Sequence, residues 1–183
     1  LSSFVYLSSV NVYGELTDKM INIDSPLKPI TWYAKSKLKS EEIIKRNLRN
    51  SEINYLIIRP SVIYDVSGTL NSGNIKRVQR IANALGFFIL PKTNNKRSYL
   101  NLETLAVFIS NNIKISMKTN QIVIAADFEP MSFRELLKKI ARPDLRILAI
   151  NPIWFRFLKL LSKDVENFLL KTTIEKRIDA NWK

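Results

Sequence analysis

The stretch FVYLSSVNVYGE at residues 4–15 decides the fold, together with YAKSK at residues 33–37. The first segment is an apolar run followed by hydroxyl side chains and a glycine, and this pattern predicts a buried strand that ends in a turn. The second segment has a tyrosine and a lysine four residues apart at the start of a predicted helix. That spacing places both side chains on one face of the helix, one turn apart.

Tyr33 and Lys37 are therefore a candidate proton-transfer pair. A lysine ammonium one turn away favours the phenolate, so we expect the pKa of Tyr33 to fall from about 10 towards neutrality. A tyrosine with such a pKa can take or give a proton at physiological pH. Ser9 leaves the predicted strand nearby and can hydrogen-bond the same substrate oxygen. The alternative is an ordinary buried strand followed by a solvated surface helix.

Further elements are predicted by local patterns. Thr31 is the predicted N-cap of a helix that runs to about residue 49. We expect its buried stripe to be Leu38, Ile43, Ile44 and Leu48. Residues 53–60, INYLIIRP, predict a second buried strand of the kind found in parallel sheets.

The second half of the chain continues with alternating helices and strands. We expect a helix at residues 74–85, a strand at 87–91, a helix that begins near Glu103, and a strand at 121–126. SFRE at residues 132–135 predicts a capping box. Residues 151–171 predict amphipathic helices, which either pack against this region or rest on an anionic membrane surface.

Composition narrows the classes of function. The chain has 183 residues, no cysteine and no histidine, which excludes disulfides, Ser-His-Asp catalysis and the usual zinc ligands. No apolar run reaches the length of a membrane span. The net charge of +13 favours anionic partners. Nucleic acid is not a predicted partner, because the chain has no zinc finger, aromatic RNA-binding signature or arginine-rich tail.

The serine strand ending in Val-Tyr-Gly-Glu, with Tyr-x-x-x-Lys after it, resembles the extended short-chain dehydrogenase/reductase family. More narrowly, it is similar to the nucleotide-sugar epimerases, dehydratases and reductases. The resemblance implies that Ser9, Tyr33 and Lys37 are catalytic. It also implies that Tyr33, Lys37 and Pro60 contact NAD or NADP, with Pro60 on the strand that passes beside the nicotinamide ring. No metal is expected.

The same resemblance implies a substrate. Arg97 matches the family arginine that grips the nucleotide diphosphate, a role that suits a guanidinium. Asn74 matches an asparagine that contacts the sugar nucleotide, although a simple helix cap is an equal alternative. Together with Ser9, these residues imply a nucleotide-diphosphate sugar, UDP-linked, as substrate. We further expect a cytoplasmic protein and a homodimer through the helix at residues 31–49.

The two residues after Ser9 partly indicate the reaction. Dehydratases of the family have an Asp-Glu pair there, whereas this chain has Val10 and Asn11, which cannot do acid–base work. The resemblance therefore favours a 4-epimerase, with a 4-keto nucleotide-sugar reductase of polysaccharide synthesis as the alternative.

The glycines point to an incomplete cofactor site. The four glycines, at 14, 68, 73 and 86, do not form the Gly-x-x-Gly-x-x-Gly turn that binds a dinucleotide pyrophosphate. The chain therefore looks like the C-terminal portion of a longer enzyme. We expect a partial α/β Rossmann-type parallel sheet in residues 1–66, and a small mixed α/β substrate region in residues 67–183 with segments that return to the first part. An inactive fragment that acts as an interaction partner is the alternative of another class.

Overall fold

The computed structural model describes residues 3–14, 20–69, 73–93, 95–114, 119–151 and 178–179. They form a mixed α/β fold with two compact units. The first unit comprises Leu1–Ile63, Ser98–Glu129 and Arg177–Lys183, and the second comprises Tyr64–Arg97 and Pro130–Lys176. The functional roles expected for residues 1–66 and 67–183 stay predictions.

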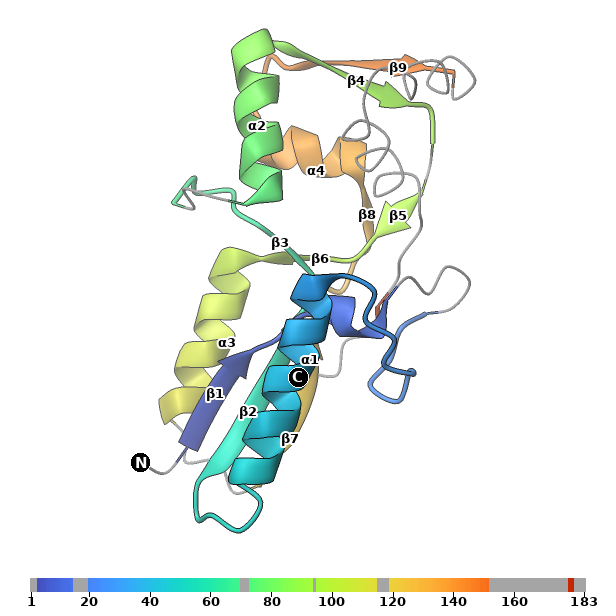
Figure 1. The fold of residues 1–183 in the computed structure, drawn as a ribbon. Coiled ribbons are helices and arrows are strands. Elements are labelled where there is room, and N and C mark those ends of the chain that lie inside the picture. The colour runs from blue at the N-terminus through green and yellow to red at the C-terminus, as the bar shows by residue number, and fades with distance from the viewer. Residues whose placement is uncertain are drawn as a thin grey trace. The chain divides into compact units, whose positions relative to one another are not determined.

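A three-stranded parallel sheet is the centre of the first unit (Figure 1). Its strands are β1 (Ser3–Leu7), β2 (Asn54–Pro60) and β7 (Gln121–Ala125), in the order β1-β2-β7. Leu7 pairs with Ile58, and Pro60 pairs with Ala125. Because the strands are parallel, their carboxyl ends meet at one edge of the sheet, where ligands bind in open α/β sheets.

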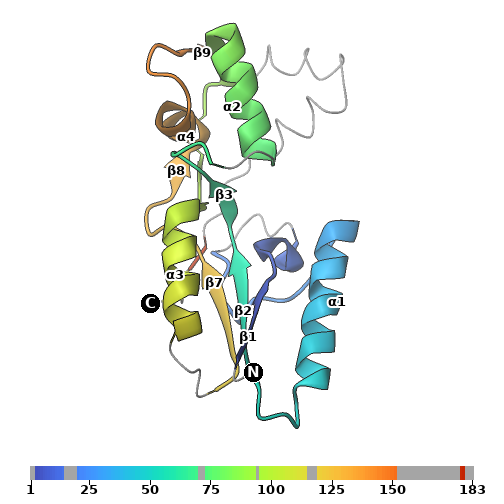
Figure 2. The same ribbon diagram turned by 90° about the vertical axis from the view of Figure 1, so that its left-hand side faces the viewer.

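Helices cover both faces of this sheet: α1 (Trp32–Asn47) lies on one face and α3 (Leu102–Lys114) on the other (Figure 2). Side chains alternate between the two faces of a sheet along each strand, so β2 packs against a helix on either side. Leu56 and Ile58 of β2 pack with Leu105 of α3. Ile57 and Arg59, which alternate with these two residues along β2, therefore project towards the face covered by α1.

The start of α1 agrees with the sequence, but its predicted buried stripe is partly wrong. Thr31 is the N-cap, and its Oγ1 accepts a hydrogen bond from the Ala34 N–H at 3.1 Å. Ile43 is 40% exposed, whereas Ala34 and Glu41 are buried. The reason is helical geometry: positions 34, 38 and 41 share one face, and position 43 points away from it.

A short helix and a glycine turn connect β1 to the loop before α1. The 3₁₀-helix η1 (Val10–Tyr13) comes soon after β1 and ends at Gly14. Gly14 has a φ of +75°, and a Cβ there would lie 2.2 Å from the carbonyl oxygen of Lys28. Only glycine fits this close approach of two backbone segments.

The second unit contains α2 (Asn74–Leu85), α4 (Phe133–Ile140) and two short strand pairs. Strand β4 (Phe87–Pro91) pairs in parallel with β9 (Arg146–Ile150), and β5 (Lys96–Arg97) pairs antiparallel with β8 (Met131–Ser132). The predicted helix at 74–85, strand at 87–91 and capping box at 132–135 are confirmed. Elsewhere, β3 (Val62–Tyr64) pairs with β6 (Tyr99–Asn101).

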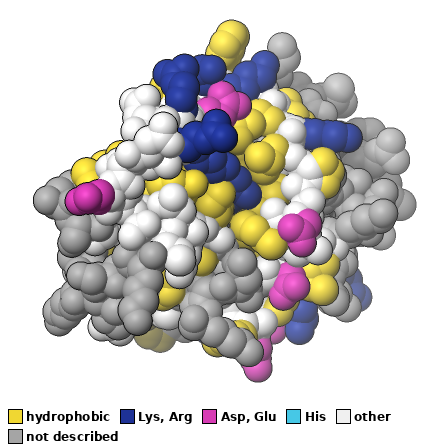
Figure 3. All heavy atoms as spheres, turned by 90° about the horizontal axis from the view of Figure 1, so that it is seen from below, with side chains coloured by type: hydrophobic (Ala, Val, Ile, Leu, Met, Phe, Trp, Pro, Cys, Tyr) yellow, Lys and Arg dark blue, Asp and Glu magenta, His cyan; other side chains and the backbone are white. Residues whose placement is uncertain are grey.

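The helices predicted at residues 151–171 lie outside the described residues. Within the described ranges, no helix is both long and apolar enough to cross a bilayer. On the face shown in Figure 3, Lys and Arg side chains lie beside hydrophobic side chains.

Candidate active site

Ser9 lies at the carboxyl edge of the sheet, just after the end of β1. The N–H of the preceding residue, Ser8, donates to the Ile58 carbonyl at 2.7 Å, so pairing with β2 continues past the end of the strand. Ser9 is 7% exposed, and its Oγ accepts the N–H of Asn11 at 3.2 Å. The hydroxyl therefore caps η1 and is held at the strand end.

Tyr33 and Lys37 lie in the first turns of α1. Lys37 Nζ donates to the carbonyl oxygen of Leu7 at 2.8 Å and lies 5.7 Å from the centroid of the Tyr33 ring. The ammonium also lies 5.1 Å from the Tyr6 ring centroid. These contacts bring the Tyr33–Lys37 face of the helix to the end of β1, two residues before Ser9. Tyr33 is 51% exposed, so its side chain is accessible to a ligand.

Pro60 lies at the same edge, as the last residue of β2. The next residue is Ser61, whose N–H donates to the Ala125 carbonyl at 2.8 Å. The Ser61 Oγ is buried and has no hydrogen-bond partner in the part of the chain that the structure describes. A buried polar atom without a partner is unfavourable unless a ligand or water satisfies it.

The two predicted substrate residues lie in the second unit. Arg97 ends β5 and pairs with Met131 of β8. Asn74 is the first residue of α2, and the N-cap position belongs to Gly73, without a side-chain cap hydrogen bond. The structure thus groups Ser9, Tyr33, Lys37 and Pro60 in the first unit, apart from Asn74 and Arg97.

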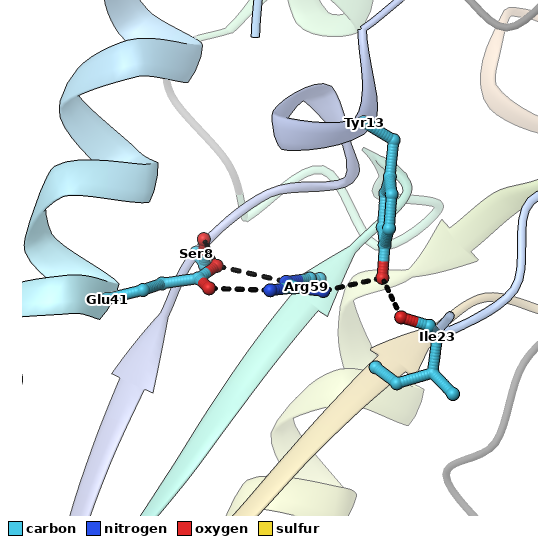
Figure 4. Close-up of polar contacts among 5 residues, drawn as sticks. All are labelled: Ser8, Tyr13, Ile23, Glu41 and Arg59. Carbon is cyan, nitrogen blue, oxygen red and sulfur yellow. Dashed lines mark hydrogen bonds and ion pairs between the residues drawn. The ribbon is translucent and has the colours of Figure 1, made fainter. Parts of the chain in front are cut away.

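Sequence reasoning missed a buried ion pair next to the site. Glu41 of α1 is 0% exposed and Arg59 of β2 is 3% exposed. Arg59 Nε donates to Glu41 Oε1 at 3.0 Å, and Nη2 donates to Oε2 at 2.7 Å (Figure 4). The Ser8 hydroxyl also donates to Oε1, at 2.5 Å. Arg59 Nη1 donates to the hydroxyl of Tyr13 at 2.6 Å, and that hydroxyl donates to the Ile23 carbonyl at 3.5 Å.

Burial and the contacts within this network shift the pKa values of Arg59 and Tyr13. Burial alone lowers the pKa of Arg59, but the hydrogen bonds and charge of Glu41 outweigh it, and the pKa is raised. Burial raises the pKa of Tyr13, against the lowering effect of Arg59. Two signals in the sequence point to the pair. Glu41 lies four residues after Lys37 on the same helix face, and Arg59 interrupts an apolar strand.

No group of three or more Asp, Glu, His or Cys side chains suited to a metal ion occurs within the described ranges.

A parallel sheet with helices on both faces and polar side chains at its carboxyl edge defines the Rossmann-like class of α/β proteins. Residues 1–113 match the model of the NAD-dependent epimerase/dehydratase family. The chain belongs to this family.

The chain is also similar to individual epimerases. The UDP-glucose 4-epimerase of Vibrio cholerae is 26% identical over 153 residues, which are 82% of this chain and 44% of that protein. The solved UDP-N-acetylglucosamine 4-epimerase of Bacillus cereus is 20% identical, with a TM-score of 0.63 over 80% of this chain and 53% of that one. The UDP-glucuronic acid 4-epimerase of Bacillus cereus, solved with NAD, is 16% identical, with a TM-score of 0.63 over 82% and 50%. The chain thus spans about half the length of these relatives.

Proposed function

We propose that the chain carries the proton-transfer residues of a nucleotide-sugar 4-epimerase that uses NAD or NADP. The observation that carries the proposal is the contact between Lys37 and the Leu7 carbonyl, which brings the Tyr33–Lys37 face of α1 to the strand end that holds Ser9. The family match and the UDP-sugar 4-epimerase activity named for the relatives support it.

The residues present fit the nicotinamide end of the cofactor. Lys37 places an ammonium at the carboxyl edge of the sheet, where it can bind ribose hydroxyls. Ser61, next to Pro60, offers a buried hydroxyl without a partner in the described ranges, which suits a carboxamide. The 183 residues contain no glycine-rich pyrophosphate turn, so the fit does not extend to the pyrophosphate. When bound, the dinucleotide supplies hydride acceptance and return.

The chain's own residues manage the proton. Tyr33 takes the proton of the sugar C4 hydroxyl as that carbon is oxidised to a ketone, and gives it back when C4 is reduced on the opposite face. Lys37 stabilises the phenolate by its positive charge. Ser9 donates a hydrogen bond to the C4 oxygen in both half-reactions. Because Tyr33 takes up one proton and later releases it, the tyrosine is unchanged after each turnover.

Residues of the second unit hold the nucleotide in this proposal. The guanidinium of Arg97 binds the diphosphate, since its planar donors match phosphate oxygens. Asn74 contacts the sugar nucleotide at the start of α2. UDP is the proposed nucleotide, because the three relatives are UDP-sugar epimerases by name.

A homodimer through α1 is part of the same proposal. The side chain of Trp32 is 87% exposed, and that of Ile43 is exposed as well, so the outer face of the helix offers apolar surface to a second copy.

The proposal is tested by an interconversion assay with NAD present. The substrates are UDP-glucose and UDP-galactose, or their N-acetyl counterparts. We expect Tyr33→Phe to lower the rate by about 10²–10⁴-fold, because the proton acceptor is removed. The matched control is Tyr55→Phe, a tyrosine of β2 near the opposite end of the strand, and it should keep the wild-type rate. No interconversion by the wild type, or equal rates in Tyr33→Phe and wild type, contradicts the proposal. If the chain instead oxidises one NADH or NADPH for each 4-keto nucleotide sugar that is reduced, the reaction is that of the reductase.

A further inference from the structure

The buried pair Glu41–Arg59 joins the elements that carry the proposed site. Glu41 lies on α1 one turn beyond Lys37. Arg59 lies on β2 directly before Pro60. The Ser8 hydroxyl, directly before Ser9, donates to the same carboxylate (Figure 4). Three neighbours of proposed site residues therefore meet in one hydrogen-bonded cluster.

The geometry of the cluster fixes directions as well as distances. Arg59 uses two parallel N–H bonds for Glu41 and a third N–H for the Tyr13 hydroxyl. A guanidinium is planar, so these partners are held at set angles around it. Tyr13 belongs to η1, the helix that Ser9 caps, and the pair is thereby connected to both sides of Ser9.

The other contacts at the site are weaker constraints. The Lys37–Leu7 hydrogen bond is exposed, and the Ser9 hydroxyl accepts only from the nearby Asn11 N–H among the contacts described for it. Charge-assisted hydrogen bonds in a buried environment hold their geometry more strongly than exposed ones. The cluster is therefore a buried polar connection between the end of β1 and α1, in contrast to the exposed Lys37–Leu7 bond.

We propose that Glu41 and Arg59 are positioning residues of the active site, which hold Ser9 at the end of β1 in register with Lys37 on α1. This inference rests on the proposed function for its catalytic consequence. Its structural content, a locally ordered strand end, stands without it.

Amide hydrogen exchange of the full chain tests the structural content, well below the unfolding temperature. The variant is Glu41→Gln, which keeps the volume but turns amide N–H donors towards Arg59. The matched control is Glu42→Gln, an adjacent and exposed residue of the same helix that pairs with Lys39. We expect exchange at the amides of Ser8, Asn11 and Gly14 to rise at least about ten-fold in Glu41→Gln relative to the amides of α3. Glu42→Gln should leave the ratio unchanged.

A uniform rise over all amides, or no rise at the strand end, overturns the proposal, since the pair then serves only global stability. If Glu41→Gln does not fold, Ser8→Ala replaces it, with Ser40→Ala as control. Ser40 donates to the Ser36 carbonyl on the exposed side of α1, outside the cluster. Ser8→Ala should again raise exchange selectively at Asn11 and Gly14, and an unchanged exchange pattern overturns the proposal.

Turnover supplies the readout that a merely structural role would not change. In 4-epimerisation, we expect Glu41→Gln to lower kcat with little change in KM. The reason is that Ser9 contacts the reacting oxygen and Lys37 acts on Tyr33, whereas neither holds the nucleotide of the substrate in the proposed mechanism. A change in KM alone contradicts positioning. If the wild type does not turn over UDP-sugars, the proposed function fails, while the exchange experiment still decides whether the pair orders the strand end.

Discussion

Arg59 occupies a position in β2 whose neighbours Ile57 and Ile58 are buried aliphatic side chains. A charge there is tolerated because the Glu41 carboxylate and the Tyr13 hydroxyl accept its hydrogen bonds. Such pairs gain little stability over apolar residues of similar volume, but breaking one partner leaves an uncompensated buried charge. Conformational specificity is the role that we propose for the pair, in keeping with its place beside the proposed site.

This asymmetry predicts a pattern of stabilities. We expect Arg59→Met alone to lower the free energy of unfolding by about 3–5 kcal/mol, because Glu41 is left buried and unpaired. The double variant Glu41→Leu/Arg59→Met should be more stable than Arg59→Met alone, since no buried charge remains. Urea denaturation of the variants measures both values. Additive losses in the double variant would show that the two side chains do not act as a pair.

At the scale of elements, the close approach of η1 and the loop before α1 depends on one glycine. Gly14 has a left-handed backbone, and an added Cβ would meet the Lys28 carbonyl oxygen at 2.2 Å. Because Lys28 lies three residues before the Thr31 N-cap, this contact helps to set where α1 begins relative to the end of β1.

Gly14→Ala should therefore destabilise the chain more than Gly86→Ala. Gly86 has a similar φ of +71°, but an alanine Cβ there meets nothing within 4 Å. The control then costs only the left-handed strain, about 1–2 kcal/mol, while Gly14→Ala adds a backbone clash. Denaturant unfolding of the two variants measures the difference. Equal losses would contradict the close packing inferred for Gly14.

The elements also show how far local sequence patterns can predict structure. Strands β1 and β2, the Thr31 cap and the Ser132 capping box are predicted by local patterns, and the structure has them where these patterns occur. The sequence places Glu41 on the helix face of Lys37 and Arg59 inside an apolar strand, but it does not show that the two pair, because they are 18 residues apart and on different elements. The pairing of β4 with β9 is another case, since the register of Phe87 with Arg146 depends on tertiary folding. The prediction of a buried Ile43 is wrong because apolar residues on a helix do not by themselves select its buried face.

At the scale of the whole molecule, the chain has the proton-transfer motif expected for its family but not the glycine-rich pyrophosphate motif. It belongs to the NAD-dependent epimerase/dehydratase family, yet spans about half the length of its relatives and has no glycine-rich turn among its 183 residues. The proposed proton-transfer residues lie in the first unit, and the proposed nucleotide-binding residues in the second.

The most direct test of the central claim, that Ser9 and Tyr33 act as one unit on the sugar C4 oxygen, is a double-mutant cycle on UDP-sugar interconversion. Residues that act as a unit in catalysis have grossly non-additive effects. We predict that Ser9→Ala/Tyr33→Phe loses no more activity than the worse of its two single variants. Losses that multiply in the double variant would show that the two side chains act independently, and would contradict the claim.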